Sequence, residues 1–133
     1  MIYRQLTEEL QKWSERDNRK PLVLRGARQV GKTTLVNELG KKYDVYIKLN
    51  LERSSDAEIF TKSDNVKEIY QYICLKKKIK VDEGKRTLLF IDEIQNEPKA
   101  VGLLRYFYEE MPWLHIIAAG SRLQTLIKQR ISF

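Results

Sequence analysis

The stretch Gly26-Ala27-Arg28-Gln29-Val30-Gly31-Lys32-Thr33 decides how this chain folds, because it fits the pattern G-x-x-x-x-G-K-[ST]. A short apolar run, Leu22-Val23-Leu24, precedes it, and a segment with apolar residues at helical spacing follows it. This order of strand, loop and helix is the context in which the pattern forms a phosphate-binding loop. The sequence therefore predicts a site for a nucleoside triphosphate.

The residue types in this loop suit a phosphate group. Gly26 and Gly31 lack a Cβ, so the backbone amides can come close to the phosphates, and the start of the following helix adds its own N–H groups. Lys32 can reach the β- and γ-phosphates, and the Thr33 hydroxyl can bind Mg²⁺. The alternative is a glycine-containing turn with an exposed lysine. The predicted phosphate-binding residues are Gly26, Ala27, Arg28, Gln29, Val30, Gly31, Lys32, Thr33 and Thr34.

A second motif is Thr87-Leu88-Leu89-Phe90-Ile91-Asp92-Glu93, an apolar run that ends in two carboxylates. Such a run is typical of a strand buried on both faces of a parallel sheet, whose carboxyl end is where ligands bind. In a P-loop ATPase, Asp92 would hold Mg²⁺ through water, and Glu93 would orient or deprotonate the water that attacks the γ-phosphate. Without the upstream loop, a strand that ends in a solvated acidic turn would explain the same residues.

With both motifs read, the chain resembles the P-loop ATPases of the AAA superfamily, and more narrowly the AAA family 14 domain of bacteria and archaea. The resemblance covers nearly the whole chain. It rests on four segments, Leu24–Leu35, Ile47–Glu52, Leu89–Gln95 and Ala119–Arg122. Proteins of this family carry the domain ahead of a C-terminal domain of unknown function.

The resemblance implies roles for two further polar residues. In AAA-type ATPases a polar residue ends the strand between the two motif strands and senses the γ-phosphate, which implies this role for Ser121. Another, at the end of the second strand, holds the catalytic glutamate away from water until a partner binds, which implies Asn50. Both residue types also favour strand-end turns for local reasons, so a purely structural role stays open.

The order of elements predicts an α/β fold. Helical and strand patterns alternate, and four strands separated by helices favour a three-layer α/β/α arrangement around a mostly parallel sheet. Residues 1–20 are interpreted as an N-terminal helix and linker, and residues 21–133 as the nucleotide-binding core of one domain. The expected strands are Leu22–Leu24, Val45–Asn50, Leu88–Asp92 and Leu114–Ala119, and the expected helices follow Gly31, Asn65, Pro98 and Ser121, with a polar link at Arg53–Asp56.

Composition agrees with a small domain of this kind. The 133 residues are 42% hydrophobic and 32% charged, enough for one core. No apolar run has the length of a membrane span or of a signal-peptide core, so the expected location is the cytoplasm. Cys74 is the only cysteine and lies on a helical apolar face, which favours a buried thiol.

The resemblance also implies that the chain is incomplete at its C-terminus. AAA-type domains continue with a fifth strand, a helical lid and an arginine that completes a neighbouring subunit's site. We therefore expect a fragment without the lid, with the C-terminal domain of the same protein as a partner and a homo-oligomer left open. Arg122 and Arg130 could be proposed as the arginine, although surface arginines are the simpler interpretation.

The net charge of +7 raises the question of nucleic acid. Basic residues concentrate in Lys76–Lys80, at Lys85 and Arg86, and in Arg16, Arg19 and Lys20. Such a surface favours phosphate backbones. A solvated basic loop is the alternative, unless aromatic side chains lie beside the charges and can stack on bases.

Three classes of function remain open from the sequence. The first is an ATP hydrolase that drives a C-terminal domain or partner. The second is a nucleotide-dependent switch with little turnover, and a basic DNA-binding module that uses ATP as a cofactor is a separate alternative to hydrolysis. The third, phosphotransfer to a small molecule, fits the loop but not Asp92-Glu93, which favours water as the acceptor.

Overall fold

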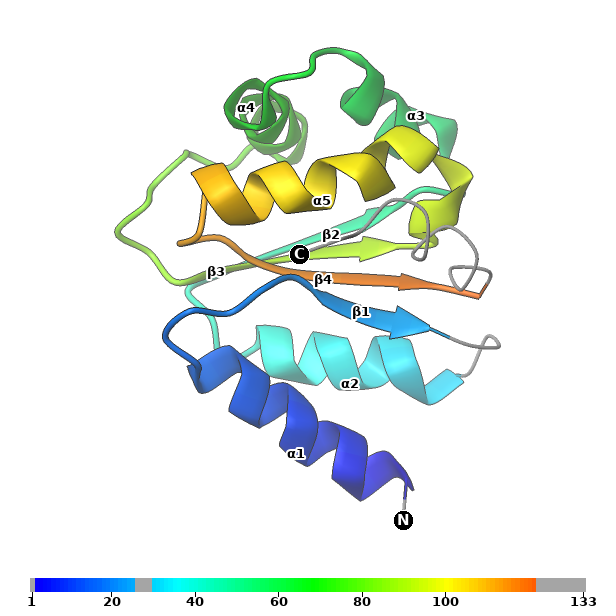
Figure 1. The fold of residues 1–133 in the computed structure, drawn as a ribbon, viewed down its shortest axis with the longest axis vertical. Helices are drawn as coiled ribbons and strands as arrows, with labels where there is room; N and C mark the ends of the chain where they lie inside the picture. The colour runs from blue at the N-terminus through cyan, green and yellow to red at the C-terminus, as the bar shows by residue number, and fades with distance from the viewer. Residues whose placement is uncertain (1, 26–29, 122–133) are drawn as a thin grey trace.

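The fold is a four-stranded parallel sheet between two layers of helices, as Figure 1 shows. The computed structural model describes residues 2–25 and 30–121. The strands are β1 (Leu22–Arg25), β2 (Val45–Asn50), β3 (Thr87–Asp92) and β4 (His115–Gly120), in the spatial order β1-β4-β3-β2. The predicted α/β class and all four strands are confirmed, with β4 displaced by one residue from the expected range.

The helices divide between the two faces of the sheet. On one face lie α1 (Ile2–Glu15) and α2 (Val30–Gly40). On the other lie α3 (Ser54–Ala57), the 3₁₀ turn η1 (Glu58–Thr61), α4 (Val66–Lys77) and α5 (Pro98–Glu110). A second 3₁₀ turn, η2 (Ile94–Asn96), joins β3 to α5. Two layers of helices on one sheet are the expected result of parallel strands joined by crossovers.

Each face of the sheet contributes alternate residues to its own core. Along β3, Leu89 and Ile91 pack with α3, α4 and α5, whereas Leu88 and Phe90 pack with α1 and α2. All four side chains are fully buried. Because β3 lies between β2 and β4 and is covered on both faces, its residues from Leu88 to Ile91 are all apolar.

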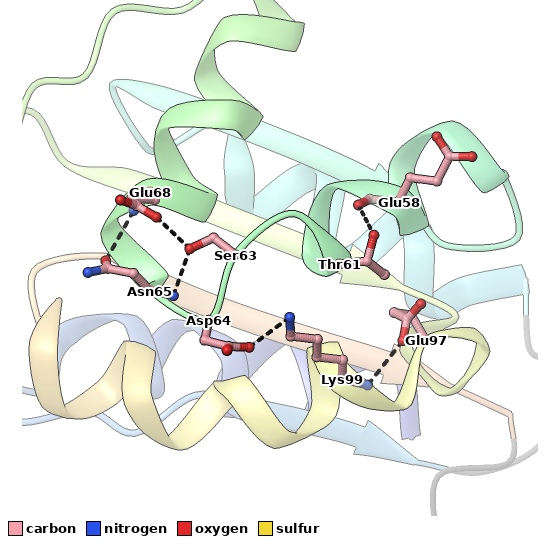
Figure 2. Close-up of polar contacts among 8 residues, drawn as sticks. All are labelled: Glu58, Thr61, Ser63, Asp64, Asn65, Glu68, Glu97 and Lys99. Carbon is pink, nitrogen blue, oxygen red and sulfur yellow. Dashed lines mark hydrogen bonds and ion pairs between the residues drawn. The ribbon is translucent and has the colours of Figure 1, made fainter.

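Local capping sets where α4 begins. Asn65 accepts hydrogen bonds from the N–H groups of Lys67 (2.9 Å) and Glu68 (3.2 Å), as an N-cap residue does. Figure 2 shows the contact of Asn65 with Glu68 beside the ion pair between Asp64 and Lys99, which are 2.9 Å apart. The loop before α4 is therefore tied to the first turn of α5.

The expected polar link at Arg53–Asp56 is wrong in part. The structure has α3 there, followed directly by η1, and Asp56, Ile59 and Phe60 are buried. Four residues are too few to show an apolar period, so the sequence pattern does not reveal the helix. The segment is held by contacts of its side chains with α4 and β2.

A buried polar cluster lies at the amino end of the sheet. His115 is 5% exposed, and its Nδ1 lies 2.5 Å from the hydroxyl of Tyr43, with the edge of its ring against Trp13. The Arg86 guanidinium lies 4.3 Å from the centre of the Tyr43 ring and donates to the carbonyl of Ser14. This cluster joins α1 to the residue before β3 and to the first residue of β4. Arg86, one of the basic residues considered above for nucleic acid, is therefore engaged within the protein.

Candidate functional site

The strand and the helix predicted on either side of the phosphate-binding loop are present. β1 ends at Arg25 and α2 begins at Val30. Gly26, Ala27, Arg28 and Gln29 lie outside the described residues. The three residues that follow Val30, including Lys32, are partly buried in the first turns of α2, and Thr34 is exposed. The N-terminal end of an 11-residue helix thus lies where the motif requires it.

Lys32 connects α2, which follows the motif loop, to β1, which precedes it. Its Nζ donates a hydrogen bond of 2.8 Å to the carbonyl oxygen of Arg25, the last residue of β1. The ammonium group therefore lies at the carboxyl end of the sheet, beside the start of α2. This is the position from which a lysine can meet the β- and γ-phosphates of a nucleotide on the loop.

Asp92 ends β3 at the same edge of the sheet and is half-buried. Its Oδ1 accepts a hydrogen bond of 2.9 Å from the N–H of Glu93. Burial raises the pKa of Asp92, and the charge of Glu93 adds to this effect, whereas the Glu93 N–H and the charge of Lys48 oppose it. Carboxylate and threonine hydroxyl oxygens are hard donors of the kind that Mg²⁺ prefers, and the binding of Mg²⁺ by Asp92 and Thr33 stays a prediction.

Glu93 follows in an unusual backbone conformation. Its φ of 51° and ψ of 46° place it in the left-handed region, which a non-glycine residue occupies at a cost of about 1–3 kcal/mol. The residue is 7% exposed, so its carboxylate is held within the protein. Backbone strain of this kind concentrates at functional sites, and here it falls on the residue predicted to act on water.

Gln95 is a residue of the site to which sequence reasoning gave no role. Its Nε2 donates a hydrogen bond of 2.7 Å to Oε1 of Glu93, and its own Oε1 is buried with no hydrogen-bond partner in the described structure. A polar residue two positions after the predicted catalytic glutamate was the available signal. Only the left-handed turn at Glu93 and the 3₁₀ turn after it bring the two side chains together.

Asn50 and Ser121 lie at strand ends, as predicted. Asn50 is the last residue of β2, and its Oδ1 accepts a hydrogen bond of 3.1 Å from the N–H of Glu52. This is the local turn contact that the structural alternative expects. Ser121 directly follows β4 and is half-buried. The roles of both residues toward nucleotide stay predictions.

The strand order brings these residues to one edge. β4 lies between β1 and β3, and the register pairs Arg25 with Gly120 on one side and Asn50 with Asp92 on the other. Because all pairs are parallel, the carboxyl ends of the four strands meet at that edge. The residues before the phosphate loop, Ser121, Asp92 and Asn50 therefore follow one another along it.

Comparison with known proteins agrees with this arrangement. A family model described as AAA domain, of the type AAA family 14, matches residues 18–132. This chain belongs to that AAA family. Members of this family are P-loop ATPases, which agrees with the fold of this AAA domain and with its two nucleotide motifs.

A solved structure shares the fold of this AAA domain. It is the Walker-type ATPase PABY2304 of Pyrococcus abyssi, with a TM-score of 0.50 and 19% sequence identity. The match covers 95% of this chain and 45% of that protein, so the AAA domain spans less than half of its length. No curated protein matches the chain.

Three further predictions about this AAA domain concern its cysteine, two C-terminal arginines and membrane-spanning segments. Cys74 is buried on α4, and burial raises the pKa of its thiol, as expected for a core cysteine. Arg122 and Arg130 lie outside the described residues. None of the helices in the described part of the chain is long and apolar enough to cross a membrane.

Proposed function

We propose that this AAA domain binds ATP with Mg²⁺ and hydrolyses the γ-phosphate, and that the cycle drives or gates a C-terminal domain or a partner. The observation that carries the proposal is the strand order β1-β4-β3-β2. It puts the two motif strands on either side of β4, so that Lys32, Asp92 and Ser121 belong to the same edge of the sheet. This edge is the ligand-binding edge of open parallel sheets.

In this proposal separate residues would bind the phosphates and the metal ion. The backbone of residues 26–31 and the ammonium of Lys32 would hold the phosphates, and the Thr33 hydroxyl and the Asp92 carboxylate would hold the metal. Mg²⁺ takes few protein ligands and completes its shell with phosphate and water, so two side chains would suffice to hold it. The bound Mg²⁺ supplies positive charge to the transferred phosphoryl group.

Glu93 would orient or deprotonate the attacking water. Its position directly after Asp92 sets it beside the metal ligand, and the bond from Gln95 orients its carboxylate. Ser121 would contact the γ-phosphate from the end of β4, and Asn50 would restrain Glu93 from the end of β2. The proposal for these two residues rests on their places at the edge and on the family resemblance.

A titration of Mg·ATP tests the binding half of the proposal. A ligand that binds only the folded state raises its apparent stability, so the melting temperature should rise with Mg·ATP. The variant Lys32→Ala should lose this rise, and Lys67→Ala, which removes an exposed lysine on α4, should keep it. An equal rise in all three proteins would place the nucleotide elsewhere and contradict the proposal.

Substitution of Glu93 tests the chemical half. Glu93→Gln should keep ATP bound and stop turnover, because it removes the base but little volume. Turnover that is unchanged in this variant would exclude Glu93 as the base. Measurement of released phosphate and of bound nucleotide distinguishes an effect on hydrolysis from an effect on nucleotide binding.

A nucleotide-dependent switch is the second candidate. Glu93 is buried and already hydrogen-bonded to Gln95, so its carboxylate must move or be rehydrated before it acts on water. If turnover of the full-length protein stays below about one per minute while ATP changes the affinity for a partner, the switch is favoured over an energy-consuming motor.

A further inference from the structure

A basic pocket lies at the outer edge of β2, the strand at the opposite edge of the sheet from β1. Its volume is about 350 Å³. Lys48, Asn50, Arg53, Ser55, Asp56, Lys76 and Lys77 line it. Four of these side chains are cations and one is a carboxylate, so the pocket attracts anions.

Asp56, the carboxylate in the wall of the pocket, already has two bonding partners within the protein. Asp56 is 5% exposed; its Oδ1 lies 2.5 Å from Nζ of Lys76, and its Oδ2 accepts a bond of 2.9 Å from the N–H of Asn50. Burial alone would raise the pKa of Asp56, but the bonds from Lys76 and Asn50 and the nearby charge of Lys77 together lower it, so it stays ionised. Asp56 therefore orients Lys76 and leaves the other cations of the pocket for an outside anion.

Those other cations are not bonded to a carboxylate in the described structure, although the charge of Lys77 acts on Asp56 and that of Lys48 on Asp92. Lys48, Arg53 and Lys77 form no ion pair with a described residue. The C-terminal carbonyls of α4 explain a preference for lysine at its end, and an edge strand favours lysine at Lys48. Neither reason explains why Arg53, which comes from the turn after β2, faces the same pocket.

An exposed aromatic ring lies on the same helix, α4, as Lys76 and Lys77 of the pocket. Tyr72 is 40% exposed and precedes Lys76 by one turn of α4, so the two share a face of the helix. Nζ of Lys62 lies 5.8 Å from the centre of the Tyr72 ring. Tyr70, by contrast, is 2% exposed and belongs to the core. An aromatic ring among cations is the combination that binds single-stranded nucleic acid, with stacking on bases and charge on the backbone.

The geometry points to a binding site for the backbone of single-stranded nucleic acid in this pocket, with a phosphate between Arg53 and Lys77 and a base on the ring of Tyr72. Direct binding does not depend on the function proposed above. The effect on the nucleotide edge does rest on that function. Because Asn50 donates to Asp56 and pairs with Asp92, an occupant of the pocket acts on the strand end next to the predicted Mg²⁺ ligand.

Fluorescence anisotropy with a labelled oligo-dT of about 20 nucleotides tests the site. The double variant Arg53→Ala/Lys77→Ala should weaken binding roughly tenfold or more, whereas Lys80→Ala/Lys85→Ala should change it less than about twofold. Lys80 and Lys85 are exposed, carry the same total charge and do not line the pocket. The slope of log affinity against log salt should fall by about 1.4 for two lost phosphate contacts, and only in the pocket variant.

A second pair of variants tests the stacking part. Tyr72→Leu should weaken binding about tenfold, and Tyr106→Leu, which removes a tyrosine on α5 that is 47% exposed and does not line the pocket, should not. Equal losses in the pocket and control variants would mean diffuse attraction by net charge and would overturn the site. No binding by the unchanged chain at about 50 mM salt would overturn it as well.

Two further arms identify the ligand and separate this inference from the function proposed above. Duplex DNA or vesicles with phosphatidylserine that compete as well as the single strand would overturn the assignment to single strands. Thermal stabilisation by Mg·ATP, measured in the same pocket variants, should be unchanged. Pocket variants that lose only their stabilisation by Mg·ATP would contradict the nucleotide site proposed at the sheet edge. Pocket variants that lose only oligonucleotide binding would support the pocket as the site for nucleic acid.

Discussion

The side-chain amide of Gln95 donates a hydrogen bond of 2.7 Å to the carboxylate of Glu93. The bond spans two positions in sequence and exists because Glu93 is in the left-handed region and Gln95 lies in the 3₁₀ turn that follows. It makes Gln95 a positioning residue for the predicted base.

Substitution of Gln95 should therefore lower turnover more than nucleotide binding. For Gln95→Ala we expect kcat to fall about tenfold with little change in KM, because one charge-assisted hydrogen bond that orients the base is lost. Steady-state phosphate release measures both constants. Gln71→Ala, at an exposed position of α4, is the matched control. A parallel loss of kcat and thermal stability in Gln95→Ala would show a structural role only.

Asp92→Asn should weaken the Mg²⁺ dependence of ATP binding. A carboxylate that holds Mg²⁺ through water contributes about 10- to 100-fold to metal affinity, and the amide keeps the shape without the charge. Titration of Mg²⁺ at fixed ATP, followed by the rise in melting temperature, gives this affinity. Glu83→Gln removes a carboxylate at an exposed position and should leave the titration unchanged. If Asp92→Asn titrates like the original chain, Asp92 is not a metal ligand.

His115 should make the protein less stable in acid. Burial, with the charges of Arg19 and Arg86, lowers the pKa of His115 to about 3, whereas an unfolded histidine has a pKa of about 6.5. Between these values the unfolded state binds the extra proton, so stability falls as the pH falls below about 6.5, by about 2 kcal/mol at pH 5.

Urea unfolding at pH 7 and pH 5 measures this effect. His115→Gln cannot titrate, so it should lose about 2 kcal/mol of the difference between the two pH values. It should also be less stable at pH 7, since the ring contacts of His115 with Trp13 and Tyr43 are lost. The same pH dependence in both proteins would show that His115 is not the group responsible.

Two glycines in helices should respond oppositely to alanine. A Cβ at Gly40 would lie 2.6 Å from the ring of Tyr46, so Gly40→Ala should cost about 1–3 kcal/mol. A Cβ at Gly102 meets nothing within 4 Å, and Gly102→Ala should stabilise α5 by about 0.5–1 kcal/mol. Urea unfolding measures the change in the free energy of unfolding for both variants. The loss of stability in Gly40→Ala should largely vanish when Tyr46 is also replaced by Ala. Equal effects at the two glycines would contradict the geometry.

Local patterns predicted most of the fold. The strand Val45–Asn50 matches β2, and Asn65 caps α4 as its position before the apolar face indicates. Pro98 begins α5, as the preference of proline for the first helical turn favours. These elements depend on periodicity and capping within a few residues, which a single sequence contains. The segment Ser54–Thr61 was missed because its helical turns depend on Asp56, Ile59 and Phe60 packing against other elements.

By itself, the sequence determined that the chain has a phosphate-binding motif, a buried strand that ends in Asp92 and Glu93, and alternating elements for a parallel sheet, because each of these depends on residues close together in the chain. Only the tertiary structure decided which side chains meet. The bond from Gln95 to Glu93 requires a particular backbone turn, the contact of Tyr43 with His115 joins residues 72 positions apart, and the basic pocket gathers cations from β2 and α4. Such contacts follow from the packing of helices on the sheet, which no local pattern specifies.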